Sequence, residues 1–547
     1  MSLQFITGGS GAGKSEYLSR LVCEESVRRP HDNFIVVVPE QYTMETQKKL
    51  VHMHSRKGIL NIDVVSFERL AYKVFEELGG GNRPVLDDTG KNLIVRRVLE
   101  KEKKKLDYFG SSIEKTGFVS ELKSVISELL QYGITPQQLG EIGENVKEKQ
   151  QLSAKLKDIR LVYKEFMAFL STNYITSEEI LDVLCGLVEK SKLIAGSEII
   201  FDGFTGFTPI QYKLMRLLLV YSKGIKISVT IDKKERPTGH EGWNNLFFMS
   251  KEMMNRLIAI CEEEGINVDD TVCVDRDINY RYEGAKDLAY LERNLFRYKD
   301  GVYTGTPENI RIYEGSNPKE ELQYIVSEIL QLTRKEGFRY RDIAVVTADL
   351  ETYGKVAANM MKQNDIPAFL DYKRSVASNP YVEMLCSALE IVEKGYPYDT
   401  MFRYLRTGLT GISRHDIDML ENYCLAVGIR GSRAWHEPWK KKMKRSTYQP
   451  ELETLNVLRE QIMAPFLNLE AVLKDKEANV RAYVTAVYEF VTALHSAEQI
   501  KALSECEPAG NEYEQLYAKV LELFDRIVEL LGEEKVSLKE FNRIVAA

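Results

Sequence analysis

The sequence has few cysteines and no long apolar run. Its 547 residues include seven cysteines, which are scattered and form no C-x-x-C pair. This spacing excludes a zinc ribbon and a disulfide framework, and it favours a reducing cytoplasm. No apolar run approaches the roughly 20 residues of a membrane span, and the chain opens on a predicted strand rather than a signal peptide. We therefore expect a cytoplasmic protein with no membrane partner.

The sequence also lacks an excess of basic residues. The chain has 74 lysines and arginines against 81 aspartates and glutamates, which gives a formal net charge of −7. This balance excludes a protein that is basic over its whole surface, although a local basic groove can still bind nucleic acid. Hydrophobic residues make up 44% and charged residues 28%, which is typical of a globular chain. The length predicts about three or four domains.

One motif near the start predicts a phosphate-binding loop. The β-prone residues 3–7 run directly into residues 8–15 (GGSGAGKS), which fit the pattern G-x-x-x-x-G-K-S. Lys14 is expected to reach the β- and γ-phosphates of ATP, and Ser15 is expected to offer its hydroxyl to Mg²⁺. A helical pattern follows and points its positive end at the anion. The glycines that let backbone N–H groups turn toward the phosphates are Gly8, Gly11 and Gly13.

Apolar strand patterns alternate with helical patterns through the first domain, residues 1–235. This alternation predicts a doubly wound parallel sheet. Long helical patterns interrupt it at about 84–192, and we interpret them as a helical insertion. Capping residues predict helix starts after Ser66, Thr135 and Thr208. The apolar runs typical of strands buried on both faces are residues 33–38, 62–65, 198–204 and 225–231.

A second α/β unit is predicted after a polar connecting segment. The segment covers residues 236–305 and is interpreted as a surface connection with helical pieces, and the second unit, 306–372, begins after it. Residues 373–547 are helical in pattern and are interpreted as a helical insertion domain. The chain stops inside an amphipathic pattern, so we expect it to be truncated. The elements predicted in the second unit are strands at 310–314, 343–347 and 368–371 and helices at 320–335 and 353–363.

An acidic residue is needed on another strand to hold the water shell of the metal. Asp202, which follows the apolar residues 199–201, is the candidate. In a motor ATPase, the residue after this aspartate is usually the Walker B glutamate, whose carboxylate positions the attacking water. Here that residue is Gly203, so we expect nucleotide binding without efficient hydrolysis. The alternative for Asp202 is a simple Asp-Gly turn.

Two α/β units in series, the first with a helical insertion, have the layout of superfamily-one helicases. The motifs together resemble the amino-terminal half of the AddB family, whose members pair with an AddA subunit in a bacterial helicase–nuclease for double-strand-break repair. The resemblance covers essentially the whole chain. Its motifs are 8–15, 38–41 (VPEQ), 65–70 (VSFERL), 202–204 (DGF) with 207–209 (FTP), 337–345 (GFRYRDIAV) and 366–369 (IPAF) with Asp371.

The resemblance implies a fold, partners and cofactors. It implies two parallel-sheet P-loop-type (RecA-like) domains with large helical insertions. The implied partners are an AddA-like motor and nuclease subunit, in a heterodimer, and single-stranded DNA from broken duplex ends. The full subunit of the family is longer and carries a nuclease domain with a 4Fe–4S cluster. Neither that nuclease activity nor the cluster is expected of these 547 residues.

The resemblance also implies contacts with DNA. In the family, the helicase domains of AddB are degenerate and scan the unwound 3′ strand for the Chi recombination hotspot. Aromatic rings can stack on bases for about 1–3 kcal/mol each, and an arginine can hold a guanine edge or a phosphate. The alternative for each aromatic residue is burial in the core. Carried over by motif, the DNA-contacting residues are Gln41, Phe67, Arg69, Tyr72, Phe204 and Phe207.

The most basic segment is residues 439–445, which begins with Trp439. A basic run beside an aromatic ring is typical of a surface that tracks a nucleic-acid backbone. An exposed loop without such a role is the alternative.

These features predict a non-motor helicase-like subunit that binds ATP and Mg²⁺ and reads single-stranded DNA in recombinational repair. Two alternatives stay open. One is an active DNA-stimulated translocase, in which another carboxylate replaces the absent one. The other is a structural adaptor, in which the phosphate loop is a relic and the helical insertions bind partners.

Overall fold

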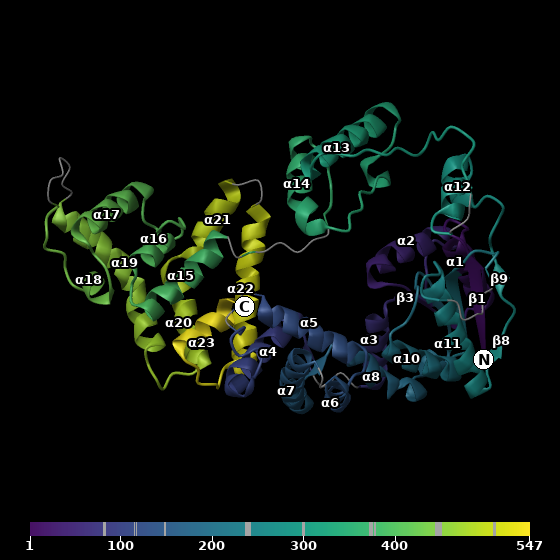
Figure 1. Cartoon of the computed structure of the whole chain (residues 1–547), viewed down its shortest axis with the longest axis horizontal. Helices are drawn as coiled ribbons and strands as arrows, with labels where there is room; N and C mark the ends of the chain where they lie inside the picture. The colour runs from purple at the N-terminus through teal and green to yellow at the C-terminus, as the bar shows by residue number, and fades with distance from the viewer. Residues whose placement is uncertain are drawn as a thin grey trace. The chain divides into compact units, whose positions relative to one another are not determined.

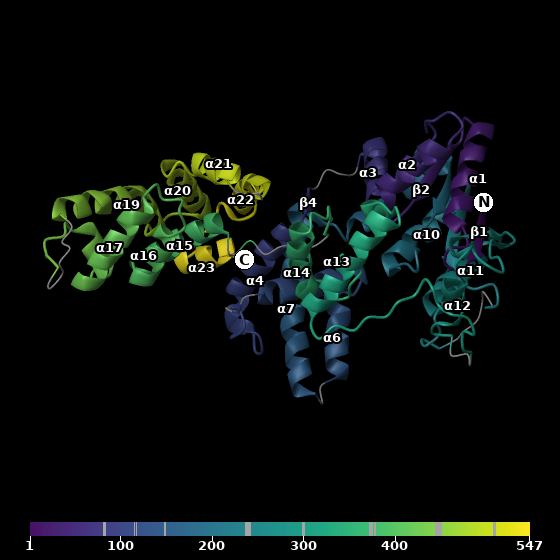
Figure 2. The same ribbon diagram turned by 90° about the horizontal axis from the view of Figure 1, so that it is seen from above.

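The computed structural model of the chain describes residues 1–547 except 80–83, 114, 116, 147–148, 236–241, 298–300, 371–375, 377–378, 444–450, 507–509 and 547. The chain divides into two compact units. The first contains residues 1–9, 13–275 and 378–547, and the second contains residues 10–12 and 276–377. Figures 1 and 2 trace the chain in two views.

A parallel sheet of seven strands forms the amino-terminal part of the first unit (Figure 1). The order of its strands is β3-β2-β6-β7-β1-β8, and β9 also pairs with β1. All of these pairs are parallel. The strands are β1 (Ser2–Gly8), β2 (Asn33–Val37), β3 (Ile62–Val65), β6 (Ser197–Phe201), β7 (Gly224–Thr230), β8 (Asn267–Val268) and β9 (Val272–Cys273).

The sheet order separates strands that are consecutive in the sequence. β1 and β2 follow one another along the chain, yet β6 and β7 lie between them. Gly8 on β1 is in register with Thr230 on β7, and Val37 on β2 is in register with Phe201 on β6. The strands are parallel, so their carboxyl ends meet at one edge. The loops that follow β1, β2 and β6 are therefore brought to the same edge.

Helices cover both faces of the sheet, which confirms the doubly wound prediction. One face packs Phe5 and Val37 against α3, α10 and α11, and the other packs Ile6 and Val36 against α1 and α2. The predicted cap at Ser66 is confirmed, because its Oγ accepts the N–H of Arg69 at 3.3 Å. The covering helices are α1 (Lys14–Arg28), α2 (Thr43–Met53), α3 (Phe67–Leu78), α10 (Pro209–Tyr221) and α11 (Phe248–Glu264), with the 3₁₀ turn η1 (Glu40–Tyr42) before α2.

Two strands of this unit have no counterpart in the sequence prediction. β8 and β9 lie in the segment 236–305, which the sequence predicts to be a surface connection with helical pieces, and α11 is one of those helical pieces. β8 and β9 have two residues each and add to the sheet beside β1. Strands of this length carry no alternating apolar pattern, so periodicity does not reveal them.

The first helical insertion contains long helices around a two-stranded sheet of β4 (Val85–Leu86) and β5 (Ile175–Thr176). The predicted caps at Thr135 and Thr208 are both confirmed as capping boxes with Gln138 and Gln211. The helices here are α4 (Asp88–Glu102), α5 (Phe118–Gln131), α6 (Pro136–Asn145), α7 (Gln150–Asn173), α8 (Ile180–Cys185) and α9 (Lys192–Ala195), with the 3₁₀ turns η2 (Lys103–Lys105) and η3 (Val188–Lys190).

The carboxyl-terminal helices share one core with this insertion. α23 buries Phe541 and Ile544 in the same cluster as Leu99 of α4, and Arg543 pairs with Glu100 at 3.0 Å. The helices are α15 (Pro380–Lys394), α16 (Tyr398–Leu405), α17 (Arg414–Val427), α18 (Ser432–His436), α19 (Leu452–Leu473), α20 (Val480–Ala493), α21 (Ser496–Cys506), α22 (Gly510–Leu531) and α23 (Leu538–Ala546). Among the described residues, no helix is both long and apolar enough to cross a membrane.

The second unit is built on the helix pair α13 and α14. The predicted helices are confirmed, and they pack through Val326, Ile329, Met361 and Ile366. The strands expected at 310–314, 343–347 and the described part of 368–371 are not formed, so that prediction is wrong for these residues. An isolated parallel strand is not stable without neighbours that take up its N–H and C=O groups. The elements are α12 (Lys286–Asn294), α13 (Pro318–Lys335) and α14 (Leu350–Gln363), with η4 (Tyr280–Tyr282) and η5 (Tyr340–Asp342).

A buried ion pair holds α4 to the turn after β5. Nζ of Lys91 donates to both carboxylate oxygens of Glu178, at 2.7 and 2.9 Å, and to Oγ of Ser177 at 3.0 Å. Lys91 is only 1% exposed. Burial alone raises the pKa of Glu178, but the hydrogen bonds and charge of Lys91 outweigh it, so the pKa is lowered. The pair therefore stabilises the fold at neutral pH, and its contribution is lost as the pH falls.

We predict that Lys91→Met lowers the free energy of unfolding by about 3–5 kcal/mol, because it leaves a buried carboxylate unpaired. Urea unfolding at pH 7 measures the loss. The difference in unfolding free energy between variant and parent should narrow as the pH falls, because protonation of the Glu178 carboxylate removes the charge that pairs with Lys91. The matched control is Lys157→Met, which breaks the exposed pair of Lys157 with Asp107 and should cost less than about 1 kcal/mol. Equal losses in the two variants would contradict the role of the buried pair.

Candidate functional site

The loop after β1 has the backbone of a phosphate-binding loop. Gly11 and Gly13 have φ angles of 71° and 95°, in the left-handed region that glycine adopts without strain. Gly13 is the N-cap residue of α1, and Lys14 is the first residue of that helix. The predicted order of strand, glycine-rich loop and helix is therefore present. The N–H groups of the first turn of α1 and the positive end of its dipole face the loop.

Lys14 lies across this loop. Its Nζ donates to the carbonyl oxygens of Gly8 at 2.8 Å and Gly9 at 2.9 Å. The ammonium group is thus held over the loop by partners that a phosphate oxygen can replace. Ser15 follows on α1 and is exposed. Both side chains are at the positions that phosphate and metal binding require.

Asp202 follows the carboxyl end of β6. Its N–H donates to the carbonyl of Val37 at 3.1 Å, which ties it to the neighbouring strand β2. Oγ of Ser228 donates to Oδ1 of Asp202 at 2.5 Å. Ser228 is on β7, the strand between β6 and β1, so this hydrogen bond fixes the carboxylate from the side of the phosphate loop. The N–H of Gly203 donates to the same hydroxyl at 3.3 Å.

The donor set suits Mg²⁺ better than a metal caged by protein ligands. Among the described residues, no group of three or more His, Cys, Asp or Glu side chains is placed to hold a metal ion. Mg²⁺ usually binds through one or two protein oxygens together with phosphates and water. The hydroxyl of Ser15 and the carboxylate of Asp202 supply such oxygens. Cys23, Cys185, Cys261 and Cys424 are free and buried.

Asp275 anchors the start of the phosphate loop. Its Oδ1 accepts the N–H of Gly9 at 2.7 Å, and its Oδ2 accepts the N–H of Lys233 at 2.9 Å. One carboxylate thus joins the loop to the segment that follows β7. Asp275 has no recognisable signal in the sequence, because a single aspartate in a polar segment carries no pattern.

In the second unit, two residues of the segment 276–282 contact the tip of the loop, residues 10–12. Nδ2 of Asn279 donates to the carbonyl of Ser10 at 3.4 Å, and the N–H of Arg281 donates to the carbonyl of Gly11 at 3.3 Å. A Cβ atom on Gly11 would lie 2.5 Å from Cβ of Arg281. This close approach explains a glycine at position 11 independently of its φ angle. The sequence offered no signal for either contact.

Three of the predicted DNA-contacting residues are exposed. Gln41 lies in η1 after β2, and Arg69 and Tyr72 lie on α3 after β3. Nε of Arg69 is 3.7 Å from Oε1 of Glu40, so the two segments are neighbours. Tyr72 is 41% exposed and packs edge-on against Phe75. All three side chains can reach a ligand in solvent.

The three predicted phenylalanines form one aromatic cluster. Phe67 is only 8% exposed, and its ring lies 5.4 Å from Phe204, 6.0 Å from Phe207 and 5.7 Å from Phe201. Phe204 and Phe207 are half-buried and keep part of their surface free. Phe67 therefore lies in the core and supports the other two rings.

The start of the basic segment is also in the core. Trp439 is 6% exposed and packs against Tyr423 and Trp435. The OH of Tyr423 donates to the carbonyl of Lys441 at 2.7 Å. Residues 444–445 of the predicted basic segment lie outside the described residues, so the alternatives for that segment stay open.

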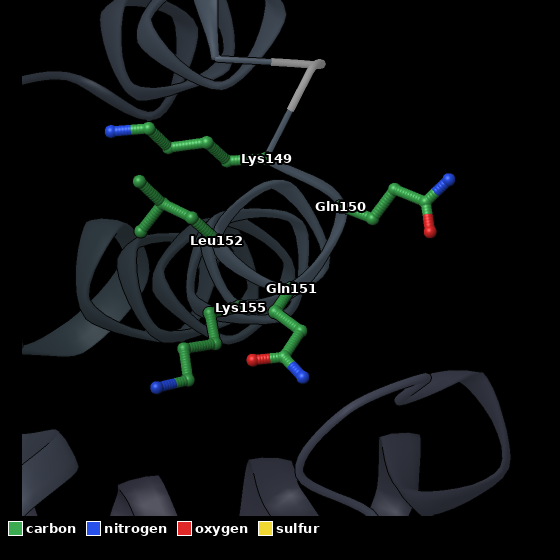
Figure 3. A pocket seen from close by; sticks show the side chains of 5 residues that line it. All are labelled: Lys149, Gln150, Gln151, Leu152 and Lys155. Carbon is green, nitrogen blue, oxygen red and sulfur yellow. The ribbon is translucent and has the colours of Figure 1, made fainter.

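A cavity of about 540 Å³ lies at the start of α7, far along the chain from the phosphate loop. Figure 3 shows its lining side chains spreading in different directions around the helix. Among the described residues, the side chains that line this cavity do not converge on a common point, so they form no binding site there. The lining residues are Lys149, Gln150, Gln151, Leu152 and Lys155.

Comparison with known proteins identifies the family. Residues 5–292 match the family model described as "ADDB, N-terminal". The chain belongs to the AddB family. This confirms the resemblance that the sequence motifs carry.

Members of the AddB family match the whole chain. It is 42% identical over 557 residues to an ATP-dependent helicase/deoxyribonuclease subunit of Lachnoclostridium phytofermentans, covering 100% of this chain and 48% of the relative. It is 35% identical over 574 residues to the protein of the same name in Symbiobacterium thermophilum, covering 100% and 49%. The chain thus spans about half the length of the curated relatives it matches.

We predict that Asp275→Ala loosens the start of the phosphate loop, because two N–H groups lose their shared acceptor. Each lost partner costs about 1–3 kcal/mol, so the amide of Gly9 should exchange with deuterium roughly 10- to 100-fold faster by that estimate. Asp275→Asn keeps one acceptor oxygen, so the Gly9 amide should exchange at a rate between those of the parent and of Asp275→Ala. Asp270→Ala removes an exposed aspartate nearby and serves as the control. Unchanged exchange at Gly9 in Asp275→Ala would argue against the anchor.

Proposed function

We propose that this chain is a non-motor, helicase-like part of a helicase–nuclease subunit that acts in double-strand-break repair by recombination. It binds ATP with Mg²⁺ and reads single-stranded DNA. The observation that carries the proposal is the convergence of the phosphate loop, Lys14, Ser15 and Asp202 on one edge of a parallel sheet. In open α/β sheets this edge is where ligands bind.

Each of these residues has a role toward the nucleotide. The ammonium of Lys14 exchanges its carbonyl partners for the β- and γ-phosphates, and the N–H groups of residues 11–15 and the positive end of α1 receive the remaining phosphate charge. Ser15 and Asp202 would hold Mg²⁺ and its water shell, and Ser228 keeps the carboxylate of Asp202 in place. The chemistry that Mg²⁺ would supply there is neutralisation of phosphate charge.

The residue after Asp202 favours binding over turnover. Gly203 has a φ angle of 85°, so a side chain at this position would be strained, and glycine itself cannot position a water. Glu198, the carboxylate that precedes it on β6, pairs with Arg29 at 2.5 Å and also with Lys226. These ion pairs hold Glu198 near the amino end of β6, whereas Asp202 follows the carboxyl end of that strand. A motor therefore has less support than a nucleotide-binding scaffold.

Single-stranded DNA is proposed to follow the same edge of the sheet. Gln41, Arg69 and Tyr72 offer an amide, a guanidinium and a ring from the segments after β2 and β3. Phe204 and Phe207 offer ring surface after β6, with Phe67 packed beneath them. Such a mixture of rings and charge suits a strand that is read base by base, which fits scanning for a Chi sequence.

The relatives are named as subunits, and from that name we propose an AddA-like motor and nuclease partner in a heterodimer. We also propose the superfamily-one layout, in which residues 306–372 begin a second RecA-like domain. The domain division at 1–235, 236–305, 306–372 and 373–547 stays part of this proposal. Nuclease activity and a 4Fe–4S cluster are assigned to the part of the longer relatives that this chain does not span.

We predict that Lys14→Ala weakens binding of a fluorescent ATP analogue with Mg²⁺ by about 100-fold, because a charge-assisted contact to the phosphates is lost. Lys48→Ala, which removes an exposed lysine on α2, is the matched control and should bind like the parent. The parent should hydrolyse ATP slowly, and single-stranded DNA should not accelerate it.

Two results would overturn this proposal in favour of its rivals. Hydrolysis that rises with single-stranded DNA and is lost in Lys14→Ala would indicate an active translocase. A folded parent that binds an AddA-like partner but neither nucleotide nor DNA would indicate a structural adaptor.

A further inference from the structure

The first helical insertion carries a concentration of basic residues. Residues 101–109 and 155–165 contain eight lysines and arginines against four aspartates and glutamates, in a chain whose net charge is −7. A local excess of one sign attracts a ligand of the opposite sign even when the whole protein repels it. We call the lysines of these two segments the insertion patch. They are Lys101, Lys103, Lys104, Lys105, Lys155, Lys157 and Lys164.

A buried carboxylate joins the two segments. Asp158 of α7 is 1% exposed, and it accepts the N–H groups of residues 107, 108 and 109 at 3.1, 2.8 and 2.9 Å. Nζ of Lys157 donates to Oδ2 of Asp107 at 2.6 Å. The chain that follows η2 is therefore fixed against the middle of α7, and the lysines of both segments belong to one region of the surface.

The acidic residues of the region do not cancel its charge. Glu102 is buried and pairs with Lys105 at 2.6 Å. The hydrogen bond to Glu102 and its charge, with a smaller contribution from Glu165 of α7, raise the pKa of Lys105. Since Glu102 and Asp107 each pair with one lysine and Asp158 is taken up by backbone N–H groups, the remaining lysines are left with their positive charge.

Three lysines of the insertion patch present this charge to solvent. Lys101, Lys104 and Lys164 are exposed, and within the described part of the chain no carboxylate lies at ion-pair distance from them. A helix dipole favours cations in the last turn, which accounts for lysines at the end of α4. It does not account for Lys157 and Lys164, which lie in the body of α7. These two are seven residues apart, so they share one face at a spacing of about 10 Å.

The insertion patch offers charge but little ring surface. Tyr108 is 38% exposed, but Nζ of Lys155 lies 5.0 Å from its ring centroid and Phe109 packs edge-on against it at 5.1 Å. Single-stranded DNA is typically held by rings on which its bases stack. A duplex keeps its bases stacked inside and presents phosphates, which lysines bind without reading the sequence. The chemistry of the insertion patch therefore fits a duplex better than a single strand.

We propose that the insertion patch binds the phosphate backbone of double-stranded DNA, whatever its sequence. This surface is built from other elements than the carboxyl edge of the first sheet, and it takes from the proposed function only that DNA is the ligand. A DNA molecule with a duplex part and a single-stranded part can then be held at two places. Binding at one place raises the effective concentration of DNA at the other.

Filter binding of the 547-residue chain to a relaxed, covalently closed circular duplex tests the inference, because this DNA has no ends and no single strand. Lys101→Gln/Lys104→Gln/Lys164→Gln should weaken binding about tenfold or more at about 50 mM salt. The slope of log affinity against log salt should become shallower by roughly two to three, since each phosphate contact contributes about 0.9. The three positions are exposed, so the variant should unfold at the temperature of the parent. Arginine at the same three positions keeps the charge and should preserve binding.

Two controls give the result its meaning. Lys476→Gln/Lys501→Gln/Lys539→Gln removes the same charge from exposed lysines of the carboxyl-terminal helices and should bind the duplex like the parent. Arg69→Ala/Tyr72→Ala, which alters the sheet edge, should also keep duplex binding, so failure of strand reading and failure of the insertion patch are distinguishable.

Three results would overturn the inference. Unchanged duplex binding in the glutamine variant of the insertion patch would show a solvated helix face. An equal loss in the carboxyl-terminal control would show an effect of net charge alone. A polyglutamate peptide that binds the parent more tightly than the duplex does, and is lost in the same variant, would identify an acidic protein segment as the occupant.

Discussion

Pairing between strands that are distant in the sequence is the constraint on which the candidate site depends. β6 and β7 come more than a hundred residues after β2, yet they complete the sheet between β1 and β2. Without them, the loop after β1 and the turn after β2 would not share an edge, and Asp202 would have no place beside the phosphate loop. The hydrogen bond from Ser228 to Asp202 is a direct product of that order. The site is thus assembled only when the inserted helices fold back.

The two helical regions of the first unit share one hydrophobic core. Helices α4 to α7 and α15 to α23 pack into one cluster of buried residues rather than two. Arg97 pairs with Glu534, and Arg543 pairs with Glu100, across this junction. The helical insertion between β3 and β6 is long, but a long insertion costs only slightly more loop-closure entropy than a short one. Burial of apolar side chains in the shared core offsets this cost. Stability of the helices and order of the first sheet are therefore coupled through the chain.

The sequence predicted those parts of the fold whose signals are local. The apolar runs of β1, β2, β6 and β7, the glycine-rich loop and the caps at Ser66 and Thr208 each specify their structure within a few residues. β8 and β9 are too short to show periodicity, and Asp275 acts through two backbone N–H groups that are far away in sequence. The strands expected in the second unit failed for a related reason, since β propensity requires pairing partners to act on.

The candidate site divides in the same way. The sequence could place Lys14, Ser15 and Asp202 at one edge of the sheet, because the glycine-rich motif and the end of an apolar strand are local signals, and their roles toward a nucleotide stay predictions. The motif alone does not decide whether Phe67 contacts DNA or lies in the core. The rings that pack against Phe67 belong to β6 and the loop after it, which are distant in the sequence. The structure places Phe67 beneath Phe204 and Phe207 and leaves Arg69 and Tyr72 exposed on α3.

The central claim is that the carboxyl edge of the first sheet reads single-stranded DNA. Equilibrium binding of a labelled single strand, at two salt concentrations and with blunt duplex as competitor, tests it most directly. Arg69→Ala/Tyr72→Ala should weaken binding by at least about tenfold, since each lost stack or phosphate contact is worth about 1–3 kcal/mol. The control Arg56→Ala/Tyr132→Ala, which removes an exposed arginine and tyrosine elsewhere, should bind like the parent. Equal affinity of both double variants would contradict the claim.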